Sequence, residues 1–289
     1  MKEYTYYPGC SDEATGIAYG LTISVVAEAL GMQLNELEDW NCCGTSPYHV
    51  AEELEALCVA GRNLAIAEEK GLDIVTGCNA CYVTLGKTNQ ILSGNPEIKA
   101  KANEALAEAN LKFNGGLNVR HILEVIVNDL GYEEIAAKAS KKLEGLKVAS
   151  YYGCQLTRPG FGFDDKENPQ SMDKLVEAIG GTPVQFEMKA RCCGASMVMS
   201  EEDLAVGLIN KILKNAVEAG ADCIIAACPL CQLNLDAYQA KAKKKNEEGY
   251  EIPVLFFTQL LGLALGLPEK ELALKKGIVS CKKVLAPYL

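Results

Sequence analysis

The sequence is poor in histidine, tryptophan and basic charge, and it has no hydrophobic run long enough to cross a membrane. Its 289 residues include two histidines and one tryptophan. Lysine and arginine number 28 against 38 acidic residues, and the net charge of −10 disfavours binding to nucleic-acid phosphates. The longest apolar stretch, VLFFTQLLGLALGL at 254–267, is shorter than the roughly 20 residues of a spanning helix. We therefore expect it to form a buried helix.

Two recognisable signals are also missing. The N-terminal MKEYTYYPGC lacks the apolar core of a secretory signal, so we expect a cytoplasmic protein. No Gly-x-Gly-x-x-Gly fingerprint for a dinucleotide or flavin is present. Against these absences stand 13 cysteines. In a reducing cytoplasm, so many thiols indicate metal or redox chemistry rather than disulfides.

Ten of the cysteines form two sets with matching spacing. Each set has a single cysteine, an adjacent pair followed by glycine, and a Cys-x2-Cys motif, and 34 residues separate the pair from that motif in both sets. The first set is Cys10, Cys42, Cys43, Cys78 and Cys81, and the second is Cys154, Cys192, Cys193, Cys228 and Cys231. Flanking segments repeat too, as in YYPGC and YYGC. The chain is therefore an internal duplication, which we predict divides into residues 1–145 and 146–289.

The periodicity around the cysteines predicts an α/β fold. KVASYYGC at 147–154 and DCIIAAC at 222–228 are short apolar runs typical of buried strands. Helical patterns at 52–71 and 201–220 each end at glycine, and another covers 95–110. Alternating strands and helices predict two tandem units with short parallel strands. The cysteines would then gather at the carboxyl ends of the strands.

Five thiols per set exceed the four that a zinc ion or a cubane iron–sulfur cluster takes. Adjacent side chains diverge, so a vicinal pair is suited to holding two metal atoms. We expect Gly44 and Gly194, which follow the pairs, to adopt positive φ and let the backbone approach a metal core. The alternative is a pair of zinc sites with spare thiols. Three cysteines have no counterpart in the other repeat and are interpreted as buried apolar residues: Cys58, Cys223 and Cys281.

On these motifs the sequence resembles the cysteine-rich "CCG" domain family, and within it the B subunits of heterodisulfide reductases. The resemblance implies two noncubane 4Fe–4S clusters, one per repeat, each held by the five cysteines of its set. It also implies an enzyme that reduces the mixed disulfide of coenzyme M and coenzyme B to two thiols, as the terminal step of methanogenic electron flow. The implied partners are the iron–sulfur C subunit and the flavin-bearing, iron–sulfur A subunit, in a larger hydrogenase or formate dehydrogenase assembly.

Several polar residues are candidates for contacts with that substrate. Arg158, Lys189 and Arg191 lie near cysteines of the second set and could bind its sulfonate, carboxylate and phosphate groups, with surface ion pairs as the alternative. His49 is a candidate proton donor, or else a hydrogen-bonded loop histidine. The competing function is a non-catalytic iron–sulfur electron-transfer component of a hydroxyacid or succinate oxidising complex.

Overall fold

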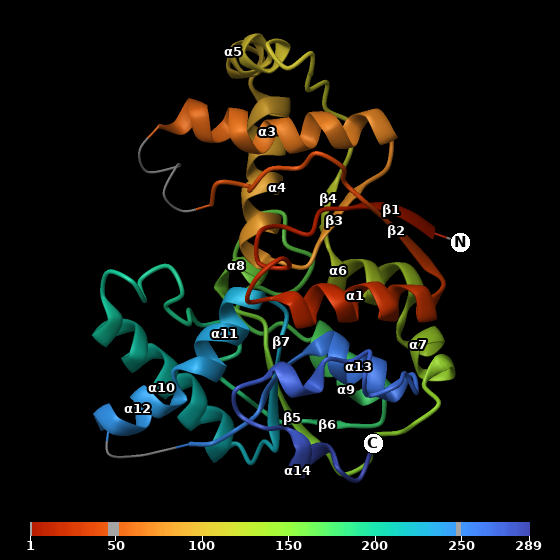
Figure 1. Ribbon diagram of the computed structural model, residues 1–289, viewed down its shortest axis with the longest axis vertical. Coiled ribbons are helices and arrows are strands. Elements are labelled where there is room, and N and C mark those ends of the chain that lie inside the picture. Colours follow the sequence, from red (N-terminus) through yellow and green to blue (C-terminus); the bar gives the residue numbers. More distant parts are fainter. Residues whose placement is uncertain (1, 46–51, 247–249) are drawn as a thin grey trace.

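The computed structural model describes residues 2–45, 52–246 and 250–289, and it contains two parallel sheets (Figure 1). The first sheet has the strand order β2-β1-β3-β4. Its strands are β1 (Lys2–Tyr6), β2 (Met32–Glu36), β3 (Ile74–Thr76) and β4 (Val119–His121). In this order β1 and β3 are the two central strands and are neighbours. Because the strands are parallel, the carboxyl ends of β1 and β3 lie side by side.

The second sheet repeats this topology with the order β6-β5-β7-β8. Its strands are β5 (Lys147–Tyr151), β6 (Thr182–Pro183), β7 (Cys223–Ala226) and β8 (Val254–Phe256). The predicted strands at 147–154 and 222–228 are β5 and β7, and both are buried apart from Lys147. The predicted α/β class with two tandem units of parallel strands is confirmed.

Helices connect and cover the first sheet. They are α1 (Ile17–Leu30), α3 (Glu53–Lys70), α4 (Asn79–Gly94), α5 (Pro96–Ala107), α6 (Ile122–Glu124), the π-helix η1 (Val125–Leu130) and α7 (Tyr132–Lys138). The expected helix at 52–71 is α3, which ends at Gly71 with φ of 68°. The expected helix at 95–110 is α5. The side chain of Asn95 caps α5 by accepting from the N–H groups of Glu97 and Ile98.

The second half has a corresponding set of helices. They are α8 (Cys154–Thr157), α9 (Ser171–Ala178), α10 (Glu202–Glu218), α11 (Pro229–Ala237), α12 (Gln239–Asn246), α13 (Phe257–Ala264), the 3-10 helix η2 (Leu274–Lys276) and α14 (Lys282–Leu285). The expected helix at 201–220 is α10. The prediction of one helix over 254–267 is wrong at its start, because Val254, Leu255 and Phe256 pair with β7 as strand β8. Residues 254–264 are nevertheless buried.

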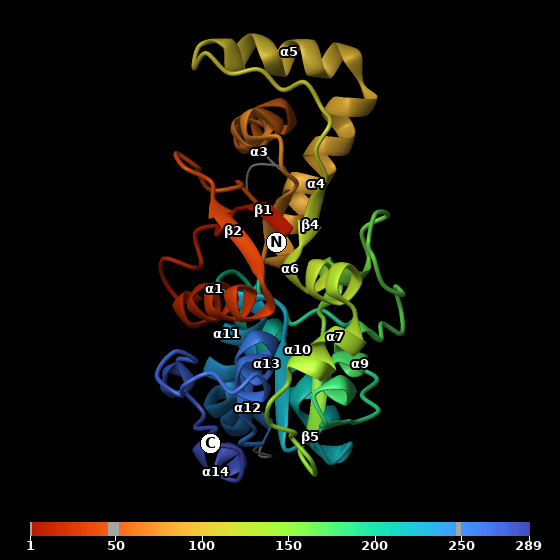
Figure 2. The same cartoon turned by 90° about the vertical axis from the view of Figure 1, so that its right-hand side faces the viewer.

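Helices of the two halves pack against each other across their interface (Figure 2). Helix α1 of the first half packs against α13 of the second, where the ring of Tyr19 stacks on Phe256 with centroids 4.3 Å apart. The hydroxyls of Thr22 and Thr258 hydrogen-bond at 2.7 Å in the same buried contact. Helix α9 is the next long helix after β5, as α1 is after β1. It packs against α6 and α7 of the first half. One hydrophobic core therefore runs through both halves.

Candidate metal centre

Each Cys-x2-Cys motif lies at the start of a helix that follows a central strand. Cys78 caps α4 two residues after β3, and Cys228 caps α11 two residues after β7. The backbone N–H of Cys81 lowers the pKa of the Cys78 thiol, and the N–H of Cys231 lowers that of the Cys228 thiol. Amides in the first helical turn have no acceptor within the helix, so they are free to stabilise thiolate charge.

The first set is compact but unevenly exposed. The sulfurs of Cys43 and Cys81 are 3.5 Å apart and buried, whereas Cys10 and Cys42 are exposed. The thiol of Cys43 and burial raise the pKa of Cys42, whereas the thiols of Cys42 and Cys81 hold the pKa of Cys43 well below its usual range against the opposing effect of burial. The divergence of the two side chains of this pair stays a prediction.

The second set surrounds a cavity. Cys192 hydrogen-bonds Cys154, whereas the sulfur of Cys193 lies 3.6 Å from that of Cys231, so this vicinal pair does diverge. The cavity has a volume of about 110 Å³ and is lined by all five cysteines of the set. Asn79 of the first half also lines it. The second set is thus arranged around a space that belongs to both halves.

The two sets meet at Cys78 and Cys228. The two residues are 4% and 2% exposed, and each thiol shifts the pKa of the other, upward for Cys78 and downward for Cys228. Sulfur contacts consequently run without a break from Cys42, through Cys78 and Cys228, to Cys193. Within the described residues, no three or more His, Cys, Asp or Glu side chains surround a single point as ligands of one metal ion. Instead, seven of the ten thiols follow one another in a line from Cys42 to Cys193, and Cys10, Cys154 and Cys192 lie outside it.

Two glycines bring the backbone against this line of sulfur. At Gly9, where φ is 75°, a Cβ atom would lie 3.0 Å from the sulfur of Cys81. At Gly153, where φ is 74°, it would lie 3.1 Å from the sulfur of Cys231. Only glycine fits such an approach. Soft thiol donors in two sets of five, with backbone drawn close around them, fit iron–sulfur groups better than single ions of fixed coordination.

The sequence matches the family described as "CCG: Cysteine-rich domain" at residues 4–86 and 148–236. The two matched segments include both cysteine sets and most of both sheets. The chain belongs to the CCG cysteine-rich domain family. Two matched segments in one chain also fit the tandem duplication.

Relatives of this CCG protein come from two kinds of complex. The 8-methylmenaquinol:fumarate reductase membrane anchor subunit of Wolinella succinogenes is 36% identical over 286 residues, which cover 98% of this chain and 99% of the relative. The B subunit of the ferredoxin/F420H2-dependent CoB-CoM heterodisulfide reductase of Methanosarcina acetivorans is 36% identical over 256 residues, or 87% and 85% of the two chains. A protein of Archaeoglobus profundus, named as similar to the heterodisulfide reductase B subunit, is 32% identical over 278 residues, 93% of each chain.

A solved structure shares the fold. The crystal structure of a hypothetical protein from Helicobacter pylori superimposes with a TM-score of 0.80 at 17% identity, covering 96% of this chain. The present chain spans about half, 53%, of that protein. Every helix within the described residues is too short or too polar to cross a bilayer.

The predicted glycines have the expected backbone, while the histidine is not placed. Gly44 and Gly194 follow the vicinal pairs with φ of 76° and 79°. The N–H of Gly194 donates to the sulfur of Cys192 at 3.3 Å. Their role toward a cofactor stays a prediction. His49 lies outside the described residues.

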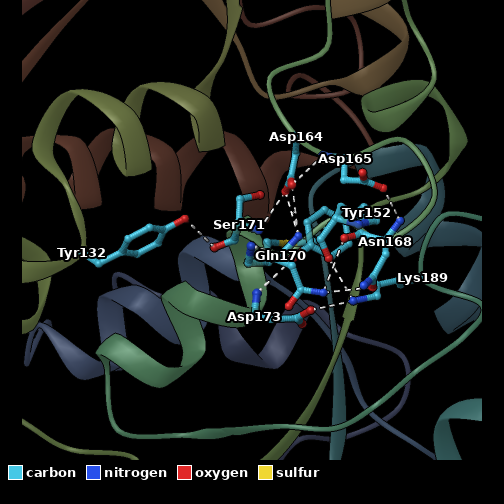
Figure 3. A network of polar contacts seen from close by, with 11 residues as sticks. Tyr132, Tyr152, Asp164, Asp165, Asn168, Gln170, Ser171, Asp173 and Lys189 are labelled. Carbon is cyan, nitrogen blue, oxygen red and sulfur yellow. Dashed lines mark hydrogen bonds and ion pairs between the residues drawn. The ribbon is translucent and has the colours of Figure 1, made fainter.

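The three predicted cations have different environments. The ammonium of Lys189 is buried and bonds the carboxylate of Asp173 at 2.8 Å and the carbonyl of Pro169 at 2.9 Å (Figure 3). The charge of Lys189 is therefore neutralised within the second half, and its ammonium is directed to Asp173 and Pro169. Arg158 is exposed, with a 3.5 Å ion pair to Glu167, and Arg191 is exposed beside the second vicinal pair.

Sequence reasoning missed a pair of tyrosines that hold the vicinal-cysteine loops. Tyr7 donates its hydroxyl hydrogen to the carbonyl of Asn41 at 2.8 Å, and Tyr151 donates to the carbonyl of Arg191 at 2.5 Å. Both tyrosines are fully buried, and burial raises their pKa values. Each accepting carbonyl immediately precedes a vicinal pair. The repeated YYPGC and YYGC segments carried this signal, because each tyrosine lies three residues before the set's first cysteine.

Proposed function

We propose that each cysteine set binds one noncubane 4Fe–4S cluster and that the chain is the disulfide-reducing subunit of a heterodisulfide reductase-type complex. The observation that carries the proposal is that the cavity lined by all five cysteines of the second set is also lined by Asn79 and Ala80, which lie between Cys78 and Cys81 of the first set. Breaking one S–S bond takes two electrons. Iron–sulfur clusters supply electrons singly, and two adjacent ones could serve the two sulfurs of one disulfide.

The proposed ligands are the ten duplicated cysteines, and their surroundings suit bound clusters. The amides of Cys81 and Cys231 stabilise thiolate charge at the buried ends of the two sets. Gly44 and Gly194 allow the loops to turn tightly after each vicinal pair. In this arrangement the chain keeps the ligands out of bulk water, apart from the exposed residues Cys10, Cys42 and Cys192.

The proposed substrate is the mixed disulfide of coenzyme M and coenzyme B. Arg191 is the best placed anion-binding residue, because it is exposed next to Cys192 and makes no ion pair with the other described residues. Arg158 would have to leave Glu167 to help, a low-cost change for an exposed pair. Lys189 is assigned to the support of its loop, since Asp173 already neutralises it. His49 remains the candidate proton donor.

The proposed setting is a cytoplasmic assembly. Some relatives are named as subunits of heterodisulfide reductases, which supports the proposal that this chain has partner subunits. We propose that an iron–sulfur C subunit and a flavin-bearing A subunit deliver its electrons. A hydrogenase or formate dehydrogenase would supply the electrons in turn.

A second candidate is an iron–sulfur electron-transfer component of a respiratory complex that acts on fumarate or succinate. It is favoured by the Wolinella succinogenes relative, whose similarity extends over 98% of this chain. The buried contact between Cys78 and Cys228 would serve electron transfer between two clusters equally well. The two candidates differ in whether a disulfide reaches the sets.

Metal content and disulfide turnover test the proposal. Purified without oxygen, the chain should contain several irons, and Cys231→Ser should lose about half of them because one set of ligands is broken. Cys281→Ser is the matched control, since Cys281 is buried outside both sets and, within the part of the chain that the structure describes, its thiol bonds the carbonyl of Leu274. The wild-type chain should oxidise a reduced viologen dye when the mixed disulfide is added.

Two results would count against this assignment. Zinc in place of iron would refute the clusters themselves. Iron that is reduced and reoxidised normally, without any spectral or kinetic response to the disulfide or to coenzyme M, would favour the respiratory role.

A further inference from the structure

Three buried residues of the second half, Tyr152, Asp173 and Lys189, form a closed network of hydrogen bonds (Figure 3). The backbone N–H of Tyr152 donates to the carbonyl of Lys189 at 2.9 Å. The ammonium of Lys189 donates to the carboxylate of Asp173 at 2.8 Å. The N–H of Asp173 donates to the hydroxyl of Tyr152 at 3.0 Å and closes the network. Each residue therefore bonds both of the others.

This 152–173–189 network lies in the interior and resists opening. Tyr152 is fully buried, and Asp173 and Lys189 are 8% and 5% exposed. Removing one partner of a buried ion pair leaves the other charge uncompensated, so the pair is costly to break. Two more bonds reinforce the network, from the Lys189 ammonium to the carbonyl of Pro169 and from the N–H of Met172 to the Tyr152 hydroxyl. The three residues thus form a rigid unit.

The network connects two segments of the second cysteine set. Tyr152 lies two residues before Cys154, and Lys189 lies three residues before Cys192. The N–H of Gly153 also donates to the carbonyl of Lys189, at 3.0 Å. This one carbonyl therefore fixes the segment of the single cysteine against the loop of the vicinal pair.

The same tyrosine is bonded to the first cysteine set. Its carbonyl accepts from the Nδ2 group of Asn79 at 2.8 Å. Asn79 lies between Cys78 and Cys81 at the start of α4 and is 1% exposed. Tyr152 is consequently bonded to segments of both sets.

The first repeat has different residues at the corresponding positions. Pro8 lies two residues before Cys10, and Asp39 lies three residues before Cys42. Proline has neither a backbone N–H nor a hydroxyl, so position 8 cannot make the bonds of Tyr152. Asp39 is exposed and pairs with Arg62 of α3. The network is therefore a specialised feature of the second repeat and was not inherited equally by both.

Building on the proposed function, we propose that Tyr152 is a positioning residue that holds the two cysteine sets in a fixed arrangement. Through Asp173 and Lys189 it places Cys154 and the second vicinal pair. Through Asn79 it ties these ligands to the first Cys-x2-Cys motif. Two cofactors that act on one disulfide need a constant separation, and Tyr152 sets it.

Thiol reactivity in the full-length, metal-free chain tests this role without any cofactor. Tyr152→Phe removes the hydroxyl that Asp173 and Met172 bond, but keeps the aromatic ring and the backbone. Alkylation by N-ethylmaleimide, followed cysteine by cysteine with mass spectrometry, should become about three- to tenfold faster at Cys193 and Cys81. The rate at Cys223, which is fully buried outside both sets, should not change.

Three outcomes of this measurement would overturn the proposal. Unchanged rates would show that the network does not hold the sets. A rise at Cys193 alone would remove the link to the first set. A similar rise at Cys223 would mean general unfolding.

The matched control is Tyr132→Phe. Tyr132 donates its hydroxyl hydrogen to the carbonyl of Ser171, the first residue of α9, at 3.3 Å and lies outside the network (Figure 3). This variant also loses one tyrosine hydroxyl bonded to α9, and it should leave all the alkylation rates at their wild-type values. An effect equal to that of Tyr152→Phe would attribute the result to a loosened helix and overturn the role of Tyr152.

A double variant keeps the test decisive if Tyr152→Phe does not fold. Lys189→Met combined with Asp173→Asn breaks the network without leaving a buried charge. It should raise the alkylation rates at Cys193 and Cys81 in the same way. Wild-type rates in this folded variant would overturn the proposal.

The iron-loaded chain provides a second readout. Electron paramagnetic resonance should show a magnetic interaction between two reduced clusters in the wild type and a weaker one in Tyr152→Phe, because the separation is no longer fixed. An identical interaction in both would contradict the positioning role. A wild-type chain without iron would instead count against the proposed function, and the alkylation result from the metal-free chain would not be affected.

Discussion

At the scale of single residues, the first half contains a fully buried histidine next to the cysteine line. His121 caps α6, where its Nδ1 accepts from the N–H of Leu123 at 3.1 Å and its Nε2 lies 2.9 Å from the carbonyl of Gly77. The ring is therefore neutral with its proton on Nε2. Burial lowers the pKa of His121 to about 4. This imidazole holds Gly77, and through it the start of the first Cys-x2-Cys motif.

This environment predicts a histidine-dependent loss of stability in acid. An unfolded histidine has a pKa near 6.5, so the unfolded chain takes up a proton before the folded chain does. The stabilisation is complete above about pH 6.5 and is lost as the pH falls toward 4, by roughly 3 kcal/mol in all. His121→Gln keeps a donor for Gly77 and an acceptor for Leu123 but does not titrate.

Chemical denaturation at pH 7 and pH 5 measures the effect. The wild-type chain should lose more unfolding free energy between these values than His121→Gln, both being in the same metal-loaded state. Parallel losses would show that the imidazole is not the titrating group.

At the scale of secondary-structure elements, local patterns predicted what local chemistry determines. Helix α3 ends at Gly71, α5 begins at the capping residue Asn95, and α10 is followed by Gly220 with φ of 78°. Strands β5 and β7 are short apolar runs that are followed by cysteines. Strand β8 was hidden in a longer apolar stretch, because its identity depends on pairing with β7, far away in the sequence. For the same reason the packing of α1 on α13 was not predictable.

The candidate site likewise has features that local sequence predicts and features that depend on distant contacts. The ten cysteines were recognisable from spacing, since the duplication displays it twice. The hydrogen bond from Asn79 to the carbonyl of Tyr152 was not, because Tyr152 lies in the other half of the chain. The buried position of Lys189 also depends on a long-range partner, Asp173, and sequence proximity to Cys192 was misleading.

Helix α4 illustrates how closely elements of the two halves fit. A Cβ atom at Gly86 would lie 2.6 Å from the ring of Phe161, whose carbonyl accepts from the hydroxyl of Tyr82 at 3.2 Å. Gly86→Ala should therefore destabilise the protein by about 1–3 kcal/mol in urea unfolding, despite the better helix propensity of alanine. Gly94→Ala in the same helix is the control, because no atom lies within 4 Å of its added Cβ.

The control variant should be neutral or slightly stabilising. Replacing Phe161 with leucine in the Gly86→Ala background should recover part of the loss, because the smaller side chain vacates the space. If Gly86→Ala and Gly94→Ala have equal effects, the contact with Phe161 does not constrain the helix.

At the scale of the whole molecule, the duplication and the packing of helices from one half against helices of the other bring the two cysteine sets together. We propose that the repeats are residues 1–145 and 146–289, since each has one sheet and one set. The repeats are not independent, however. The stacked rings of Tyr19 and Phe256 and the paired hydroxyls of Thr22 and Thr258 join them inside one core. A cofactor pair at the centre would thus be sealed by packing from both repeats.

This shared core predicts that neither repeat folds alone. Residues 1–145 expressed separately would expose the face of α1 that contains Tyr19, Ile23 and Val26, all buried in the full chain. Because such a surface favours aggregation, we expect no cooperative thermal transition from either fragment. The two fragments, split after the exposed Gly145, should form a soluble complex when they are co-expressed. The packing between helices of the two halves needs no covalent link at that position. A cooperative melting transition of residues 1–145 alone would contradict this dependence, and amide hydrogen exchange in α1 would then show whether its packing on α13 matters to stability.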